Sequence, residues 1–251
     1  MNSALTMTFA ALIEGLANFR LGTGTAINNG FLADALNNAQ KTVWEMPAGK
    51  KWVWPFTVQT LADVALTDGV IPLESVDYAR WWALYSADPR GVGSMGYPIP
   101  SYIDGDGIHP INNTLATYFV FYIPRTPEFT GTPAAVETDY KLDDIVYDTG
   151  RSGSTGECYR CLEDYTSGAD DAALNDELAD TDQWKVQPVY KNFQSAMQSM
   201  ASAQYYKMVG SMDAANQAIA TGMNDLEQLW KSIRRGANYA PAQVLATGTW
   251  R

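Results

Sequence analysis

The spacing of apolar residues changes twice along this chain of 251 residues, and that change limits the folds open to it. Near both ends, apolar side chains recur every three or four residues, which is the period of an amphipathic helix. Between residues 51 and 189, short runs of aromatic and β-branched residues favour strands instead. The chain therefore predicts an α+β fold with helices at both ends of a β-rich middle.

Four helices are expected, two at each end of the chain. The first covers about 9–20 and the second 31–45, and Gly22 and Gly30 lie in the break between them. A third helix begins near residue 190, and a fourth follows Gly210 and ends at Gly236. Their expected buried stripes contain Phe9, Leu12, Ile13 and Leu16; Leu32, Leu36, Ala39 and Val43; Phe193 and Met197; and Ala215, Ile219, Gly222 or Met223, Leu226, Trp230 and Ile233. Short loops join each pair, so we expect two helix hairpins that pack as an antiparallel bundle.

The middle of the chain is expected to contain several short strands. Residues 78–85 and 115–123 are the strongest candidates, and residues 144–148 and 157–163 resemble the two arms of a hairpin. Residues 88–110 are rich in Gly and Pro and predict a long loop. Further segments are strands at 57–66 and 184–189, and a loop or short helix at 169–182. The expected domains are a helical bundle (1–50 and 190–238), a β-rich insertion (51–189) and an extended C-terminal tail (239–251).

Charge is scarce in this sequence and unevenly distributed. The chain has 17 Lys+Arg and 28 Asp+Glu, a net charge of −11, and only 18% charged residues against the roughly 25% usual for soluble domains. Residues 131–190 alone contain 4 basic and 14 acidic residues, while residues 191–251 contain 6 basic and 3 acidic ones. A surface so poor in charge indicates that neighbouring subunits cover part of it.

Several classes of protein are disfavoured. The acidic balance disfavours a dedicated nucleic-acid binder, which needs a basic face for phosphates. The longest nearly apolar run, 115–123, is far shorter than the roughly 20 residues of a membrane-spanning helix. No Lys or Arg precedes Arg20, which disfavours a signal peptide and indicates synthesis in a reducing cytoplasm. In that setting, Cys158 and Cys161 are expected to be unpaired thiols.

The motifs that could support catalysis or metal binding are incomplete. His109 is the single histidine, and no serine-hydrolase elbow accompanies it, so we expect an exposed loop residue. The glycine pattern at 91–96 is followed by Tyr-Pro-Ile-Pro, which cannot begin the helix that a dinucleotide site requires. One C-x-x-C pair supplies half a zinc site, and 104–107 is a fragment of a calcium loop. We therefore expect no enzyme activity, catalytic residues, metal site or cofactor.

The order of these elements resembles the head-to-tail connector adaptors of tailed bacteriophages, the ring proteins that dock below the portal. The similarity covers residues 5–85 and 190–238. It depends on the opening hairpin with Leu32, Leu36, Ala39 and Trp44, the cluster Trp52-Val53-Trp54-Pro55-Phe56, the segment 68–73, and an Ala-rich helix–Gly–helix unit with Ala203, Gly210, Ala214 and Ala215.

The resemblance implies a structural virion protein in the neck between head and tail. It implies a homo-oligomeric ring, commonly twelve-fold in that family, that contacts the portal and tail or nozzle proteins while DNA passes through its channel without specific binding. The C-terminal segment would order on the portal, and Trp and Arg are frequent interface anchors. The candidate interface residues are Trp230, Arg234, Arg235, Tyr239, Trp250 and Arg251.

A second, local resemblance leads to an alternative function. The segments 145–147, 159–162 and Trp184 are similar to small β modules of phage structural proteins and of some carbohydrate-binding modules. The alternative is therefore a glycan-binding or receptor-contacting phage protein, with Tyr147, Tyr159 and Trp184 as candidate glycan contacts. Aromatic residues of a small β module more often form its core, and that interpretation is favoured for these three.

Overall fold

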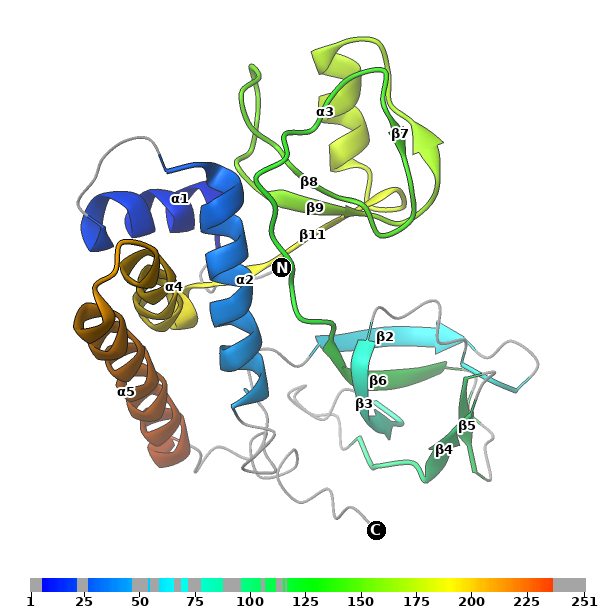
Figure 1. Cartoon of the computed structure of the whole chain (residues 1–251). Helices are drawn as coiled ribbons and strands as arrows, with labels where there is room; N and C mark the ends of the chain where they lie inside the picture. The colour runs from blue at the N-terminus through cyan, green and yellow to red at the C-terminus, as the bar shows by residue number, and fades with distance from the viewer. Residues whose placement is uncertain are drawn as a thin grey trace. The chain divides into compact units, whose positions relative to one another are not determined.

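The computed structural model confirms a mixed fold of helices and strands (Figure 1). It describes residues 6–21, 27–46, 54, 59–65, 69–71, 78–87, 96–104, 107–111, 115 and 117–236. The chain divides into two compact units, one made of 1–45 and 127–231 and the other of 46–126 and 232–251. This division differs from the expected domains, because residues 127–189 group with the helices rather than with the rest of the β-rich middle. Most of the Trp52–Phe56 cluster and the tail 239–251 lie outside the described residues.

The four predicted helices are present, and all but the last turn of α5 belong to the first unit. They are α1 (Phe9–Glu14), which continues as the π-helix η1 (Gly15–Arg20), then α2 (Asn29–Glu45), α4 (Gln194–Met208) and α5 (Met212–Gly236). The predicted stripes of the first two helices are buried: Phe9, Leu12, Ile13 and Leu16, and Leu32, Leu36, Ala39 and Val43. The helical period of the sequence therefore identified these two faces correctly.

The middle of α4 is buried around its whole circumference. Every residue from Ala196 to Ala203 is buried. Five of these eight side chains are Ala or Ser, and such small side chains let neighbouring helices approach closely. Helix α2 and the π-helix η1 both pack against α4. Such a helix has no single apolar face, so its sequence shows only a weak stripe.

The turn between α4 and α5 is a Schellman motif. Gly210 adopts a φ of +80°, its N–H donates to the carbonyl of Lys207 at 3.1 Å, and Ser211 N–H donates to the carbonyl of Tyr206 at 2.8 Å. Ser211 then precedes α5, and its carbonyl accepts the N–H of Ala215 at 3.0 Å. Gly210 and Ser211 separate the two helices, as the sequence predicted.

The remainder of the first unit is a small β module (residues 127–190). Its sheet has the order β11 (Trp184–Val186), β9 (Cys158–Cys161), β8 (Ile145–Tyr147), with antiparallel pairing, so the predicted hairpin is confirmed. The acidic stretch forms α3 (Asp171–Ala179), where Asp170 caps the helix by accepting the Ala173 N–H at 2.8 Å. Shorter pairs are β7 (Asp139–Tyr140) with β10 (Tyr165–Thr166), and β12 (Val189–Tyr190) with β1 (Thr6–Met7).

The second unit contains a three-stranded antiparallel sheet. Its order is β2 (Gln59–Ala65), β6 (Thr117–Pro124), β3 (Tyr78–Tyr85), which confirms three predicted strands. The segment expected to be a loop instead contains a hairpin of β4 (Ser101–Ile103) and β5 (Ile108–Pro110). A strand of three residues is too short to show the alternation of apolar and polar side chains that identifies a strand. The hairpin is closed by a hydrogen bond from the Asp104 N–H to the Gly107 carbonyl, which no sequence pattern predicts.

Candidate interaction surface

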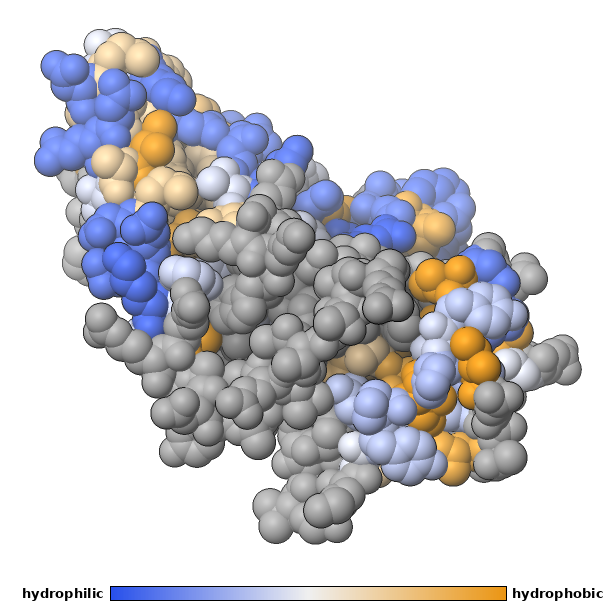
Figure 2. Space-filling model, turned by 90° about the horizontal axis from the view of Figure 1, so that it is seen from below, coloured by the Kyte–Doolittle hydropathy of each residue, from blue (hydrophilic) through white to orange (hydrophobic). Residues whose placement is uncertain are grey.

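Helix α5 presents an exposed apolar stripe. Met212 is 55% exposed, and Ile219 and Met223 are each 36% exposed. Their spacing of seven and four residues places the three side chains on one side of the helix. Met208 and Val209 extend this apolar surface at the α4–α5 turn. We call these five residues the α5 stripe, and Figure 2 shows tan and orange surface among hydrophilic residues on the side where the helices lie.

The α5 stripe corrects one part of the predicted buried face. Ala215, Gly222 and Leu226 do face inward, and a Cβ on Gly222 would lie 2.6 Å from Met200 Cγ of α4. Ile219, expected beside them, is exposed instead, and of the two alternatives Gly222 and Met223 the buried one is Gly222. The apolar arc of α5 is wider than the area that α4 covers. The sequence indicates this wider arc, because Met212 lies on the same side of α5 as Ile219 and Met223.

Of the six predicted interface residues, the structure describes the side chain of Trp230 alone. Trp230 is half-buried and follows Met223 by seven residues, so it continues the side of α5 on which the α5 stripe lies. Arg234 and Arg235 belong to α5, but the structure does not describe their side chains. Tyr239, Trp250 and Arg251 lie outside the described residues.

The predicted glycan-contact residues lie in the core. Trp184 is 2% exposed, and its indole N–H donates to the Tyr165 hydroxyl at 2.7 Å. Tyr147 and Tyr159 are each 5% exposed, and the ring of Tyr147 packs edge-on against Phe9 with centroids 5.2 Å apart. These aromatic side chains hold the module together, and in the described structure none of the three presents a ring face for a sugar.

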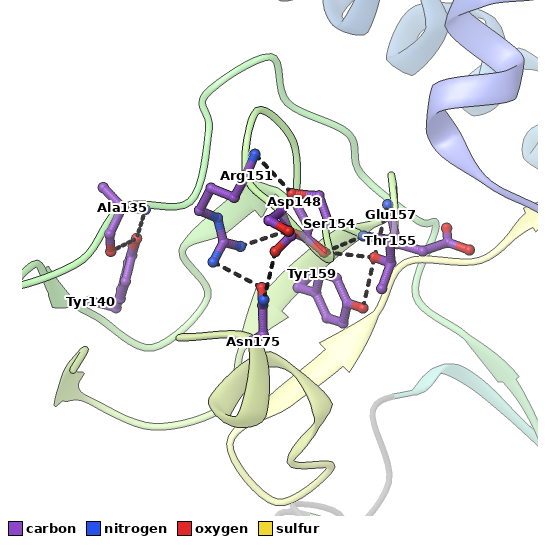
Figure 3. A network of polar contacts seen from close by, with 10 residues as sticks. Ala135, Tyr140, Asp148, Arg151, Ser154, Thr155, Glu157, Tyr159 and Asn175 are labelled. Atoms are coloured by element: carbon purple, nitrogen blue, oxygen red, sulfur yellow. Dashed lines mark hydrogen bonds and ion pairs between the residues drawn. The ribbon is translucent and has the colours of Figure 1, made fainter. Parts of the chain in front are cut away.

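A buried ion pair organises the β8–β9 loop (Figure 3). Arg151 donates to Asp148 at 2.5 Å and to the Asn175 amide oxygen of α3 at 3.0 Å. The second carboxylate oxygen of Asp148 accepts the backbone N–H of Thr155 at 2.6 Å and its hydroxyl at 2.8 Å. Each oxygen of the buried carboxylate is thus paired, as a buried charge requires. These contacts fix the loop to α3.

Glu157 is the last residue of this loop, and its carboxylate points toward α1 and away from Asp148 (Figure 3). Burial raises the pKa of Glu157 to about 7, although a hydrogen bond from the Phe9 backbone lowers it in part. The neighbouring Gly156 carbonyl accepts the Ala10 N–H at 2.8 Å. The loop therefore supplies two acceptors for the free N–H groups at the start of α1. No local sequence pattern predicts this contact, because Glu157 and Phe9 are far apart along the chain.

The two cysteines and the histidine all lie in strands. Cys158 and Cys161 are free and buried, which confirms the predicted unpaired thiols, and burial raises the pKa of Cys158 to about 12. His109 was expected in an exposed loop, but it lies in β5, where Nε2 is 2.8 Å from Asp104 Oδ1. Its ring stacks on Tyr102 of β4 with centroids 4.7 Å apart, because the two residues face each other across the hairpin.

No family model, curated protein or solved structure matches the chain. Among the residues that the structure describes, no group of three or more His, Cys, Asp or Glu side chains could hold a metal ion. Within the same residues, no helix is both long and apolar enough to cross a membrane.

Proposed function

We propose that this chain is a non-enzymatic structural subunit of a homo-oligomeric ring, an adaptor between the portal and the tail of a tailed bacteriophage. The α5 stripe is the observation that carries the assembly part of this proposal. The sequence resemblance to connector adaptors supplies the identity of the ring. In each subunit, the four helices form an antiparallel bundle, and the α5 stripe packs against a second copy of the chain.

The character of the α5 stripe supports a protein partner. Its five side chains are apolar, and three of them are Met, a flexible residue that is common in binding surfaces. Grouped exposed apolar side chains on a soluble protein mark contact surfaces. The low charged fraction of the whole chain supports contact with further copies, since subunit interfaces contain few charged residues.

The remaining partners follow from the same proposal. The portal receives the C-terminal tail with Tyr239, Trp250 and Arg251, and tail proteins contact the other end of the ring. The net charge of −10 in residues 131–190 would repel DNA that passes through the channel. The assembled location is the neck of the virion, after synthesis in the host cytoplasm.

Assembly through the α5 stripe is tested by native mass spectrometry of purified chain. The double variant Ile219→Asp with Met223→Asp places two charges in the α5 stripe. Its matched control, Asn224→Asp with Gln228→Asp, adds the same charges at exposed positions on the hydrophilic side of α5. We expect the wild type and the control to form the same oligomer and the stripe variant to be monomeric, with unchanged circular dichroism. A stripe variant that assembles like the wild type contradicts the proposed interface.

Portal docking is tested separately by negative-stain microscopy of the chain mixed with a portal. We expect a ring on the portal with the full chain and none with a chain that lacks residues 239–251. If the truncated chain binds the portal as well as the full chain, docking through the tail is wrong. If the full chain remains monomeric with the portal, the adaptor proposal itself is wrong.

A further inference from the structure

A cleft of about 270 Å³ lies between α4 and α5, apart from the α5 stripe. Its volume lies just below the roughly 300–1,000 Å³ of typical ligand sites, so only a small molecule fits. Along α4 the residues that line the cleft are spaced three and four positions apart, and along α5 they are spaced three, one and three positions apart. Each helix therefore lines the cleft with one of its faces. The lining residues are Ser199, Ser202, Tyr206, Ala214, Gln217, Ala218 and Thr221.

The cleft has a buried floor and an open rim. Ser199 is 2% exposed and Ser202 is 3% exposed, whereas Gln217 and Thr221 are exposed. The hydroxyl of Ser199 has no hydrogen-bond partner within the described chain. A buried hydroxyl without a partner is unfavourable, and most such groups in proteins are paired. A ligand that reaches the floor of the cleft would supply the missing partner.

The polar groups of the cleft define the chemistry of that ligand. Ser202 donates its hydroxyl hydrogen to the Ser199 carbonyl at 2.7 Å, and Thr221 donates to the Gln217 carbonyl at 2.9 Å. Both hydroxyl oxygens therefore keep lone pairs that can accept hydrogen bonds from a ligand. The Ser199 hydroxyl and the Gln217 amide can each donate and accept. None of the lining residues is charged, so the cleft offers no counter-charge to an ionic ligand.

We propose that this cleft binds a neutral polyhydroxylated ligand of about the size of one sugar ring. Sugar hydroxyls are donors and acceptors at once, which matches the lone pairs of Ser202 and Thr221 and the free hydroxyl of Ser199. The same chemistry is found in a free monosaccharide and in the terminal sugar of a glycan chain. This site is unrelated to the buried Tyr147, Tyr159 and Trp184.

Assembly through the α5 stripe leaves the cleft open. The cleft residues Ala214, Gln217 and Thr221 each lie two positions from a stripe residue, namely Met212, Ile219 and Met223. Residues two apart on a helix point about 200° from each other. The α5 stripe and the cleft therefore lie on opposite sides of α5, and each can be tested without disturbing the other.

The test is saturation-transfer-difference NMR of the full chain, which works for a monomer or a ring. The probes are glucose, galactose and mannose, each also offered at the non-reducing end of a trisaccharide, with glucuronate as the charged comparison. We expect saturable binding of at least one neutral sugar and weaker binding of glucuronate. Binding of the trisaccharide alone identifies a glycan chain as the source, and binding of both forms identifies the single sugar ring. Absence of saturable binding with every probe overturns the proposal.

Three substitutions locate the binding. Ser199→Ala should weaken it about tenfold, the size expected for one lost hydrogen bond, without lowering the thermal stability of the free chain. Thr221→Ala should also weaken it. The control Thr42→Ala removes an exposed threonine hydroxyl that bonds the carbonyl four residues earlier in the same way, but on α2, and should change nothing. Binding that is unaffected by both Ser199→Ala and Thr221→Ala overturns the proposal.

Discussion

At the residue scale, Gln198 contacts the first helix where α1 passes into its π-helical turn. Its side-chain amide is buried and donates to the carbonyl of Leu12 at 3.1 Å. A π-helical turn changes the normal pairing of the helix carbonyls, and an inserted side chain is a recognised cause of such a change. A Cβ on Gly15 would overlap the Gln198 amide nitrogen, so only glycine leaves room for this contact.

Gly15→Ala is therefore expected to lower the free energy of unfolding by about 1–3 kcal/mol, even though Ala is the better helix former. Chemical denaturation of the single variants and of Gly15→Ala with Gln198→Ala measures the effect. Because the shorter side chain removes the clash, the double variant should lose less stability than the sum of the two single variants. Additive losses would show that Gly15 and Gln198 do not interact as described.

Glu157 predicts a pH dependence of stability. Its pKa in the folded chain, about 7, lies above the ordinary value of 4.5, so the fold disfavours the ionised form. The folded chain therefore holds the Glu157 proton more tightly than the unfolded chain does. The contribution of this proton to the free energy of unfolding is complete below the unfolded pKa and is lost as the pH rises through about 7. Denaturation at pH 5 and at pH 8 should show a smaller loss of stability with rising pH in Glu157→Gln than in the wild type.

The control for Glu157 is Glu163→Gln, which removes the same charge at an exposed position of the same module. This variant should retain the pH dependence of the wild type. An equal pH dependence in the wild type and Glu157→Gln would contradict the assignment.

At the scale of elements, the sequence identified most helices and long strands. The stripe of α2 and the bounds of β3 at 78–85 follow directly from their periods. These periods predicted neither the hairpin of β4 and β5 nor the part of α5 that α4 covers. Periodicity shows which side of a helix is apolar, but the packing of α4 against α5 decides how much of that side is covered.

Gly222 tests the close packing of α4 and α5. A Cβ at this position would lie 2.9 Å from the Ala196 carbonyl as well as near Met200. On a free helix surface, replacing Gly by Ala adds about 1 kcal/mol of stability. Here Gly222→Ala is expected to lower the free energy of unfolding by about 1–3 kcal/mol, because backbone must move. Thermal and chemical denaturation give the sign, and a stabilised variant would contradict the close approach.

At the scale of the whole molecule, the distribution of charge separates two kinds of contact. The acidic residues are concentrated in 131–190, while the α5 stripe is apolar. Association driven by apolar burial is not weakened by salt, whereas association driven by exposed charges is screened. The dependence of assembly on salt therefore reports which surface is used.

Sedimentation velocity at about 50 mM and about 500 mM NaCl provides the measurement, since the Debye length falls severalfold between these concentrations. If the α5 stripe forms the interface, the oligomer should be as stable at high salt as at low salt. Dissociation at high salt would assign the contact to charged residues instead.

The sequence by itself determined the α+β class, the four helices and the principal strands, because each depends on contacts or propensities within a short stretch of chain. Tertiary structure decided the rest. It joined residues 127–189 to the helices, buried Tyr147, Tyr159 and Trp184, exposed Ile219 and Met223, and formed a cleft between α4 and α5. Each of these outcomes depends on which surfaces meet across long separations in sequence, and local periodicity contains no information about that choice.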